Sequence, residues 1–154
     1  MKTTSKLLVL WGKGSRGKTT TLNLVIEKMV KLYHAKNVAG GMPNNLAANC
    51  WIVLEFQNKK IGFITAGDSE NEIKTRLNAM DAQCPDCDLY VSASRTKRSS
   101  CEYLKSNFTG HEIVWIEKEG VTSNHGNTKE IQLLQNKAND VQSCLIIEAI
   151  IMLL

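Results

Sequence analysis

Hydrophobic positions along the chain fall into short blocks with two different periods. Residues 6–11 form a nearly continuous apolar run, KLLVLW, which is typical of a strand buried on both faces of a parallel sheet. Between residues 18 and 33, apolar side chains recur at spacings of three and four, and this pattern predicts a helix with one buried face. The sequence therefore predicts a strand and a helix joined by a glycine-rich loop.

The middle of the chain changes pattern twice. Residues 35–50 have no period and contain glycine, proline and asparagine, which predicts a long loop of the kind that acts as a lid or binding segment. Two apolar runs follow, separated only by the polar residues 57–60. That connection is too short for a parallel crossover, so an antiparallel hairpin is expected, with a helix beginning near Glu70.

The second half continues the alternation of short and long apolar patterns. Strands are expected at residues 88–94 and 111–118, and helices at 99–107 and 128–153. Strands that alternate with helices predict one α/β domain over residues 1–154, with helices on both faces of an open, mostly parallel sheet. Ligands of such sheets bind beyond the carboxyl ends of the strands.

Composition narrows the class of protein. The chain of 154 residues is 43% hydrophobic and 22% charged, which is ordinary for a globular protein. Its net charge of +4 is the balance of 19 basic and 15 acidic residues, and the basic residues are scattered, so nucleic acid is not an expected partner. The longest apolar run, 145–154, contains Glu148 and is shorter than the roughly 20 residues that span a membrane. With five cysteines and no signal peptide, a cytoplasmic location is expected.

The glycine-rich loop carries the most specific motif. Residues 12–19, GKGSRGKT, match G-x-x-x-x-G-K-[ST] at every fixed position, after a predicted strand and before a predicted helix. The segment resembles the Walker A motif of the P-loop NTPases. The resemblance implies a three-layer α/β fold that binds a nucleoside triphosphate with Mg²⁺. A basic turn without a ligand is the alternative.

The resemblance also assigns roles to individual residues. Lys18 would bridge the β- and γ-phosphates, and the Thr19 hydroxyl would bind magnesium. Lys13 and Arg16 occupy variable positions, where solvated charges are expected. The residues implied in nucleotide binding are Gly12, Lys13, Gly14, Ser15, Arg16, Gly17, Lys18, Thr19 and Thr20.

A P-loop protein also needs an acid that holds magnesium, usually at the end of the strand beside the first one. Asp68 ends an apolar run and is the preferred candidate, both as a metal ligand and as a catalytic residue. The alternative is that Asp68 only caps the helix at residue 70. Glu55 and Glu117 are the reserve candidates.

A basic segment, residues 94–98, follows the strand at 88–94 directly. Its cations are expected at the ligand edge, where an arginine could neutralise charge on a transferring phosphoryl group. Arg95 lies closest to the strand and is the preferred catalytic residue. A solvated basic turn is the alternative.

One branch of the family is disfavoured by specific departures. Residues 65–67, TAG, resemble a stretch of the Ras-like GTPases, but Ile64 stands where that branch has an aspartate. The segment 35–50 contains no Thr or Ser that could bind the metal. The guanine-binding N-K-x-D is approached only by residues 136–139, which end in an amide and lie in a predicted helix. ATP is therefore the expected nucleotide.

Two further features have structural explanations. Cys84 and Cys87 have the spacing of half a zinc site or of a redox pair, but a second spaced pair is absent from the sequence, so structural thiols are expected. The C-terminal run 144–154 is apolar nearly all round. It is expected to close the core, and a homodimer interface is the alternative.

The sequence therefore predicts an ATP-binding P-loop protein with Lys18, Asp68 and Arg95 as catalytic residues. Such a protein would hydrolyse ATP with Mg²⁺ or transfer its terminal phosphoryl group to an unidentified acceptor. The alternative is a regulatory or assembly module with little turnover, in which the nucleotide orders the segment 35–50.

Overall fold

The structure is a computed structural model of the chain and describes residues 1–14, 17–95 and 99–154. The predictions that concern Ser15, Arg16 and residues 96–98 lie outside these ranges. The elements in chain order are β1 (Lys6–Trp11), α1 (Lys18–Leu32), β2 (Lys36–Gly40), β3 (Trp51–Phe56), β4 (Lys59–Ile64), α2 (Glu70–Gln83), β5 (Leu89–Ser94), α3 (Ser99–Asn107), β6 (Ile113–Glu117) and α4 (Lys129–Leu153).

The strands form one mixed sheet in the order β2-β3-β4-β5-β1-β6. The pairs β4·β5, β5·β1 and β1·β6 are parallel, whereas β2·β3 and β3·β4 are antiparallel. In register, Trp11 of β1 lies beside Ser94 of β5 and Glu117 of β6. The prediction of an α/β fold with a mostly parallel sheet is confirmed.

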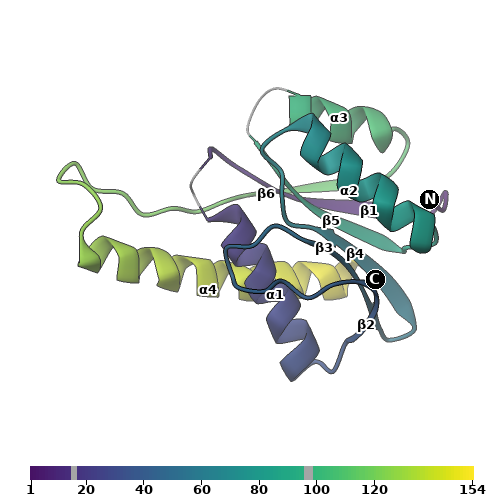
Figure 1. Cartoon of the computed structure of the whole chain (residues 1–154), viewed down its shortest axis with the longest axis horizontal. Helices are drawn as coiled ribbons and strands as arrows, with labels where there is room; N and C mark the ends of the chain where they lie inside the picture. Colours follow the sequence, from purple (N-terminus) through teal and green to yellow (C-terminus); the bar gives the residue numbers. More distant parts are fainter. Residues whose placement is uncertain (15–16, 96–98) are drawn as a thin grey trace.

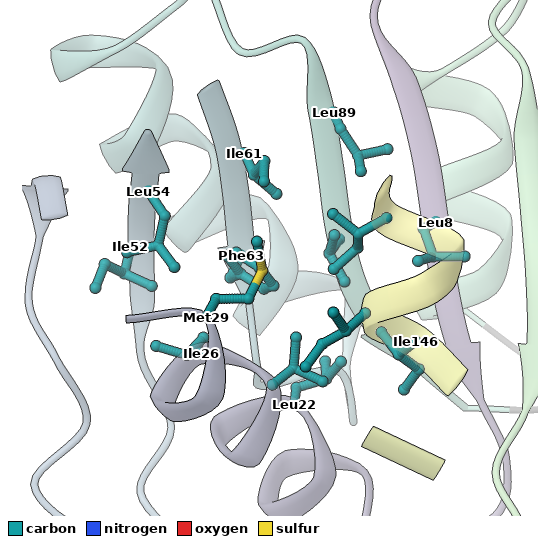
Figure 2. Close-up of a cluster of buried hydrophobic side chains, with 14 of the residues drawn as sticks. Leu8, Leu22, Ile26, Met29, Ile52, Leu54, Ile61, Phe63, Leu89 and Ile146 are labelled. Atoms are coloured by element: carbon teal, nitrogen blue, oxygen red, sulfur yellow. The ribbon is translucent and has the colours of Figure 1, made fainter. Parts of the chain in front are cut away.

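Helices cover both faces of the sheet, with α1 and α4 on one side and α2 and α3 on the other (Figure 1). Leu8 and Leu10 belong to the core under α1 and α4, whereas Leu7 and Val9 belong to the core under α2 and α3. Figure 2 shows side chains of α1 directed at strand residues in the first of these cores. Both faces of β1 are therefore buried, which explains its continuous apolar sequence.

The predicted hairpin is present and is tighter than its polar connection suggested. Trp51 pairs with Ile64, and Phe56 pairs with Lys59. Only Gln57 and Asn58 lie in the turn, with φ angles of 52° and 60°. Two successive positive φ angles are the geometry of a type I′ turn, whose twist matches that of the two strands.

The prediction of a loop over residues 35–50 is wrong in its first part. Residues 36–40 form the edge strand β2, in which Lys36 pairs with Glu55 and Gly40 with Ile52. Four of its five residues are exposed. The segment therefore lacks the alternation of apolar and polar residues that identifies a half-buried strand in sequence. Its backbone is held because β3 offers an unpaired edge.

The order of the strands corrects a second prediction. The strand that leads to Asp68 was expected beside β1, but β5 lies between β4 and β1. The physical reason is that α2 joins β4 to a parallel neighbour, and such crossovers commonly connect adjacent strands. Asp68 must therefore reach the glycine-rich loop across the end of β5.

Helix α4 closes the core under α1, as expected for the C-terminal run. Ile146, Ile147 and Ile150 are buried and belong to the same cluster as Leu22 and Ile26 of α1. Within residues 1–14, 17–95 and 99–154, no helix has the length and apolarity that a membrane crossing requires.

Candidate phosphate-binding loop and its surroundings

The glycine-rich loop begins at the carboxyl end of β1 and is fixed there by both neighbouring strands. The Gly12 N–H donates to the Ser94 carbonyl at 3.1 Å, and the Lys118 N–H donates to the Trp11 carbonyl at 2.7 Å. A Cβ on Gly12 would lie 3.2 Å from the Lys118 Cβ, so little space exists for a side chain. These contacts place the loop at the edge where parallel α/β sheets bind ligands.

The loop ends at Gly17, which is the N-cap of α1 in the left-handed region with φ 83°. This conformation favours glycine, and a Cβ here would also lie 2.9 Å from the Asn139 Oδ1 atom of α4. Gly17 has no side chain to cap the first turn of α1. The positive end of the helix therefore faces the loop, where a negative group would be stabilised.

Lys18 has a buried ammonium group at the centre of the site. Its side chain is 5% exposed, and its Nζ donates to the carbonyls of Gly12 at 2.9 Å and Lys13 at 3.0 Å. The same Nζ lies 3.8 Å from the Asp68 Oδ1 atom. Burial lowers the pKa of Lys18, the nearby Asp68 carboxylate raises it, and Arg95 lowers it further. The structure thus holds a partly desolvated cation inside the loop.

Asp68 is not the cap of α2, which removes the structural alternative for this residue. Ser69 is the N-cap, and its hydroxyl accepts from the Glu72 N–H at 3.2 Å. The Glu72 carboxylate in turn accepts from the Asp68 N–H at 3.1 Å. The Asp68 carboxylate instead lies near Lys18 and 3.5 Å from the Arg95 Nε atom. Its side chain is 61% exposed.

Gly67 explains how Asp68 reaches a loop two strands away from β4. After Ile64, the chain continues over the carboxyl end of β5, where Gly67 packs against the backbone. A Cβ on Gly67 would lie only 2.2 Å from the carbonyl carbon of Ala93. A glycine is therefore needed for this close approach, which brings Asp68 to the loop.

Thr19 joins the first turn of α1 to the end of β4. Its hydroxyl donates to the Thr65 carbonyl at 2.9 Å and contacts the Asn49 Oδ1 atom at 3.3 Å. Thr65 also holds the segment before β3, because its hydroxyl accepts from the Cys50 N–H at 2.9 Å. The Thr19 oxygen thus lies at the same sheet edge as the chain segment that carries Asp68.

Arg95 follows β5 and lies against the loop. A Cβ on Gly14 would be 2.8 Å from the Arg95 Nη2 atom, so the guanidinium packs over Gly14. The structure therefore brings Lys18, Asp68 and Arg95 together. Lys13 contributes a carbonyl and has an exposed side chain, and Thr20 is half-buried in α1. Ser15 and Arg16 lie outside the described residues.

Two buried asparagines hold chain segments near the site, and the sequence did not identify their roles. Asn23 of α1 is buried, and its amide donates to the carbonyls of Leu46 at 2.9 Å and Ala48 at 2.8 Å. It anchors the segment between β2 and β3 to α1. Asn139 is buried against Gly17, and it accepts from the Gln135 amide at 2.9 Å. A signal for Asn23 existed, since it interrupts the apolar face of the predicted helix.

The two reserve candidates differ in position. Glu55 pairs with Lys60 at the start of β4, at the opposite end of the sheet from the loop. Glu117 is exposed at the end of β6, in register with Trp11 of β1, so it lies at the same edge of the sheet as the loop. Cys84 and Cys87 are buried, and burial raises the pKa of Cys87 to about 12. A protonated thiol is a poor nucleophile and metal ligand, which agrees with a structural role.

The assembled site is made of oxygen and cationic groups. Across the described ranges, no group of three or more His, Cys, Asp or Glu side chains is arranged to hold a metal ion. A magnesium site of the P-loop kind needs fewer protein ligands, because phosphates and water complete it. No family model, curated protein or solved structure matches this chain.

Proposed function

We propose that the protein binds ATP with Mg²⁺ at residues 12–20 and hydrolyses it or transfers its terminal phosphoryl group. The observation that carries the proposal is the Lys18 ammonium, buried inside the loop within 3.8 Å of the Asp68 carboxylate. Burying a cation is unfavourable unless it gains charged or hydrogen-bonding partners. A phosphate that enters the loop would supply a stronger partner than the two carbonyls that Lys18 now contacts.

The backbone of the loop supplies the rest of the phosphate site. In a Walker A loop, successive N–H groups and the start of the helix surround the phosphates, and the motif extends this role to Ser15 and Arg16. Gly17 supports this use, because its left-handed conformation ends the loop at the uncapped start of α1. Both fixed glycines of the motif, Gly12 and Gly17, lie so close to neighbouring side chains that an added Cβ would be crowded.

A magnesium ion would use oxygen atoms at this edge of the sheet. Thr19 and Asp68 would hold it, which is a set of one hydroxyl and one carboxylate of the kind that Mg²⁺ accepts beside phosphates and water. The ion would neutralise charge on the β- and γ-phosphates. The Thr19 hydroxyl now donates to Thr65, the third residue before Asp68, so both oxygens come from neighbouring chain segments.

Arg95 would stabilise the charge that develops on the transferred group. Its guanidinium lies over Gly14 and contacts Asp68 at 3.5 Å. A planar group with five N–H donors suits phosphate oxygens. Catalysis would then depend on positioning and electrostatic stabilisation, with little covalent chemistry from the protein. ATP is proposed as the nucleotide because residues 136–139 lie within α4 and end in an amide.

One observation favours the alternative, a regulatory or assembly module with little turnover. In the part of the chain that the structure describes, Asp68 is the one carboxylate within 4.0 Å of the Lys18 Nζ atom. A module with little turnover would not need a second acid beside this lysine. The Thr19 contact with Asn49 connects the metal position to the segment before β3, through which occupancy could change a protein interface.

Titration calorimetry with ATP, GTP and ADP, with and without Mg²⁺, tests the proposal. We expect magnesium-dependent ATP binding that is at least about tenfold weaker in Lys18→Ala, because a charge-assisted contact to phosphate is lost. Lys31→Ala is the matched control, since Lys31 is an exposed lysine on the same helix. Equal ATP affinity in wild type and Lys18→Ala would exclude the proposed site.

Turnover separates the proposal from its alternative. Phosphate release from ATP, or its transfer to an added acceptor, would support an enzyme. Tight binding of a non-hydrolysable ATP analogue, without phosphate release from ATP, would instead support the regulatory module.

A further inference from the structure

Two tryptophans frame a cavity that shares only Arg95 with the proposed nucleotide site. The cavity has a volume of about 270 Å³ and is lined by Trp11, Arg95, Cys101, Lys105 and Trp115. Trp11 is in register with Glu117, and Val9 is in register with Trp115. The two tryptophans are therefore diagonal neighbours on the same face of the sheet, and both pack against the core under α2 and α3.

Helix α3 forms one side of this cavity. Cys101 and Lys105 are one helical turn apart, so both side chains face the hollow between the indoles. The walls are thus set by regular elements, because β1, β6 and α3 fix the backbone of four of the five lining residues.

The lining combines aromatic faces with cations. The Lys105 Nζ atom lies 5.7 Å from the centroid of the Trp115 ring, a cation–π distance. Its acidic neighbour, Glu102, is 3.9 Å away in an exposed pair, and such pairs contribute little. Arg95 contacts Asp68 through Nε, while its guanidinium also borders the cavity. A ligand between the indoles would meet flat apolar surface and two positive charges.

We propose that this cavity binds a small planar aromatic ligand that carries a negative charge. The aromatic part would pack against Trp11 and Trp115, and its anionic group would contact Lys105 and Arg95. Sites for drug-sized ligands measure roughly 300–1,000 Å³, so a cavity of about 270 Å³ suits one or two fused rings.

Arg95 connects the cavity to the glycine-rich loop, because its side chain lines the cavity and also packs over Gly14 of the loop. This connection rests on the proposed function: with ATP bound, the ligand would lie beside the terminal phosphate, at the position of an acceptor. The binding of the ligand itself does not depend on ATP.

Calorimetry with three probes tests the ligand class. The probes are 2-naphthoate, its neutral analogue 2-naphthamide, and the non-aromatic anion cyclohexanecarboxylate. We expect naphthoate to bind wild type more tightly than either analogue. Absence of naphthoate binding, or equal binding of an analogue, would overturn the proposal.

Variants locate the binding. Trp115→Leu should weaken naphthoate binding about tenfold, because one aromatic wall is lost. Lys105→Gln should weaken naphthoate severalfold and leave naphthamide unchanged. Trp51→Leu is the control, because β3 lies four strands from β6, about 19 Å along the sheet. Thermal melts of each variant verify folding. Unchanged affinity in Trp115→Leu, or equal loss in Trp51→Leu, would overturn the assignment to this cavity.

The two proposals fail separately. A protein that binds naphthoate but no ATP would contradict the proposed function and support the cavity. A protein that binds ATP but no naphthoate would do the reverse. Where both bind, a change in naphthoate affinity on adding ATP with Mg²⁺, lost in Arg95→Gln, would support the connection through Arg95, and independent binding would overturn it.

Discussion

A lysine ammonium that is 5% exposed is costly for a protein to keep. Lys18 satisfies its hydrogen bonds through two loop carbonyls, yet burial still lowers its pKa from the ordinary value of 10.5. The charged form is therefore disfavoured in the folded protein relative to the unfolded chain. A buried lysine with this balance is what the proposed phosphate site would need.

Replacing Lys18 with methionine should separate stability from function. Methionine has a similar length and no charge, so Lys18→Met should keep or raise stability without ligand, by up to about 1 kcal/mol, while ATP binding is lost. Because the folded pKa is lowered, the charge costs stability below that pKa, and the cost disappears as pH rises towards 10.5. Urea unfolding at several pH values should show the gain near neutral pH and its decrease at high pH. A clear loss of stability in Lys18→Met would contradict this explanation.

Asp68 should matter for the metal and not for the fold. Its carboxylate is 61% exposed and its backbone, not its side chain, joins the cap of α2. Asp68→Asn should therefore melt like wild type but lose about tenfold or more of the magnesium-dependent part of ATP affinity. Asp86→Asn is the control, because Asp86 is an exposed aspartate paired with Lys60. If magnesium dependence persists in Asp68→Asn, Asp68 is not the metal ligand.

At the scale of elements, the site depends on one close approach between chain segments. Gly67 lies against the carbonyl of Ala93, and this contact carries Asp68 across the end of β5. The same crossing brings Thr65 to the Thr19 hydroxyl. The contact between the end of β4 and the start of α1 therefore depends on Gly67, because a side chain at this position would prevent the crossing.

Gly67→Ala should damage both stability and the site. The added Cβ would lie 2.2 Å from backbone atoms of Ala93, so β4 or β5 must shift, and we expect a loss of about 3 kcal/mol. Gly41→Ala is the control, since a Cβ there would meet nothing within 4 Å. Chemical denaturation of both variants measures the difference. Equal stability of the two variants would contradict the packing described here.

Several elements could be predicted from sequence because their patterns are periodic. The strand at 6–11, the helix that begins at Lys18 and the hairpin after residue 50 all match the structure. The edge strand β2 could not be predicted, because its pairing with β3 and not its own composition holds it. The strand order could not be predicted, because local sequence does not specify which strands pair with β1; in the structure these are β5 and β6.

The sequence carries a signal for the cap of α2. Asp68 and Ser69 are both good N-cap residues, but Glu72 follows Ser69 at the spacing of a capping box. In the structure Ser69 accepts from the Glu72 N–H, while the Glu72 carboxylate accepts from the Asp68 N–H, so the Asp68 side chain takes no part in the cap. The contacts of Asn49 and Asn139 had no comparable signal, because they join segments distant in sequence.

At the scale of the whole molecule, α4 has an inner and an outer face. The inner face closes the core, whereas Leu134, Val141, Leu145 and Met152 form an exposed stripe at heptad spacing. Val141 and Leu145 also line a groove of about 540 Å³ that includes Ile116 of the edge strand β6. The homodimer through this helix stays a prediction. The stripe supports it, because two α4 helices related by a two-fold axis would bury the stripes of both protomers against each other.

Sedimentation at increasing protein concentration tests that prediction. We expect a reversible dimer that dissociates in Val141→Lys, because a charge would be buried in the pair. Leu32→Lys is the control, since Leu32 is an exposed apolar residue on α1. A wild-type protein that stays monomeric at every concentration would exclude the dimer.

The central claim is that the loop between β1 and α1 holds the phosphates of ATP. Hydrogen exchange with and without ATP and Mg²⁺ tests it most directly, because it reports on backbone N–H groups segment by segment. Protection is predicted in the peptide that spans residues 12–20 and in the segment that carries Asp68, and it should be absent in Lys18→Ala. Unchanged exchange in the loop, or protection confined to other parts of the chain, would contradict the claim.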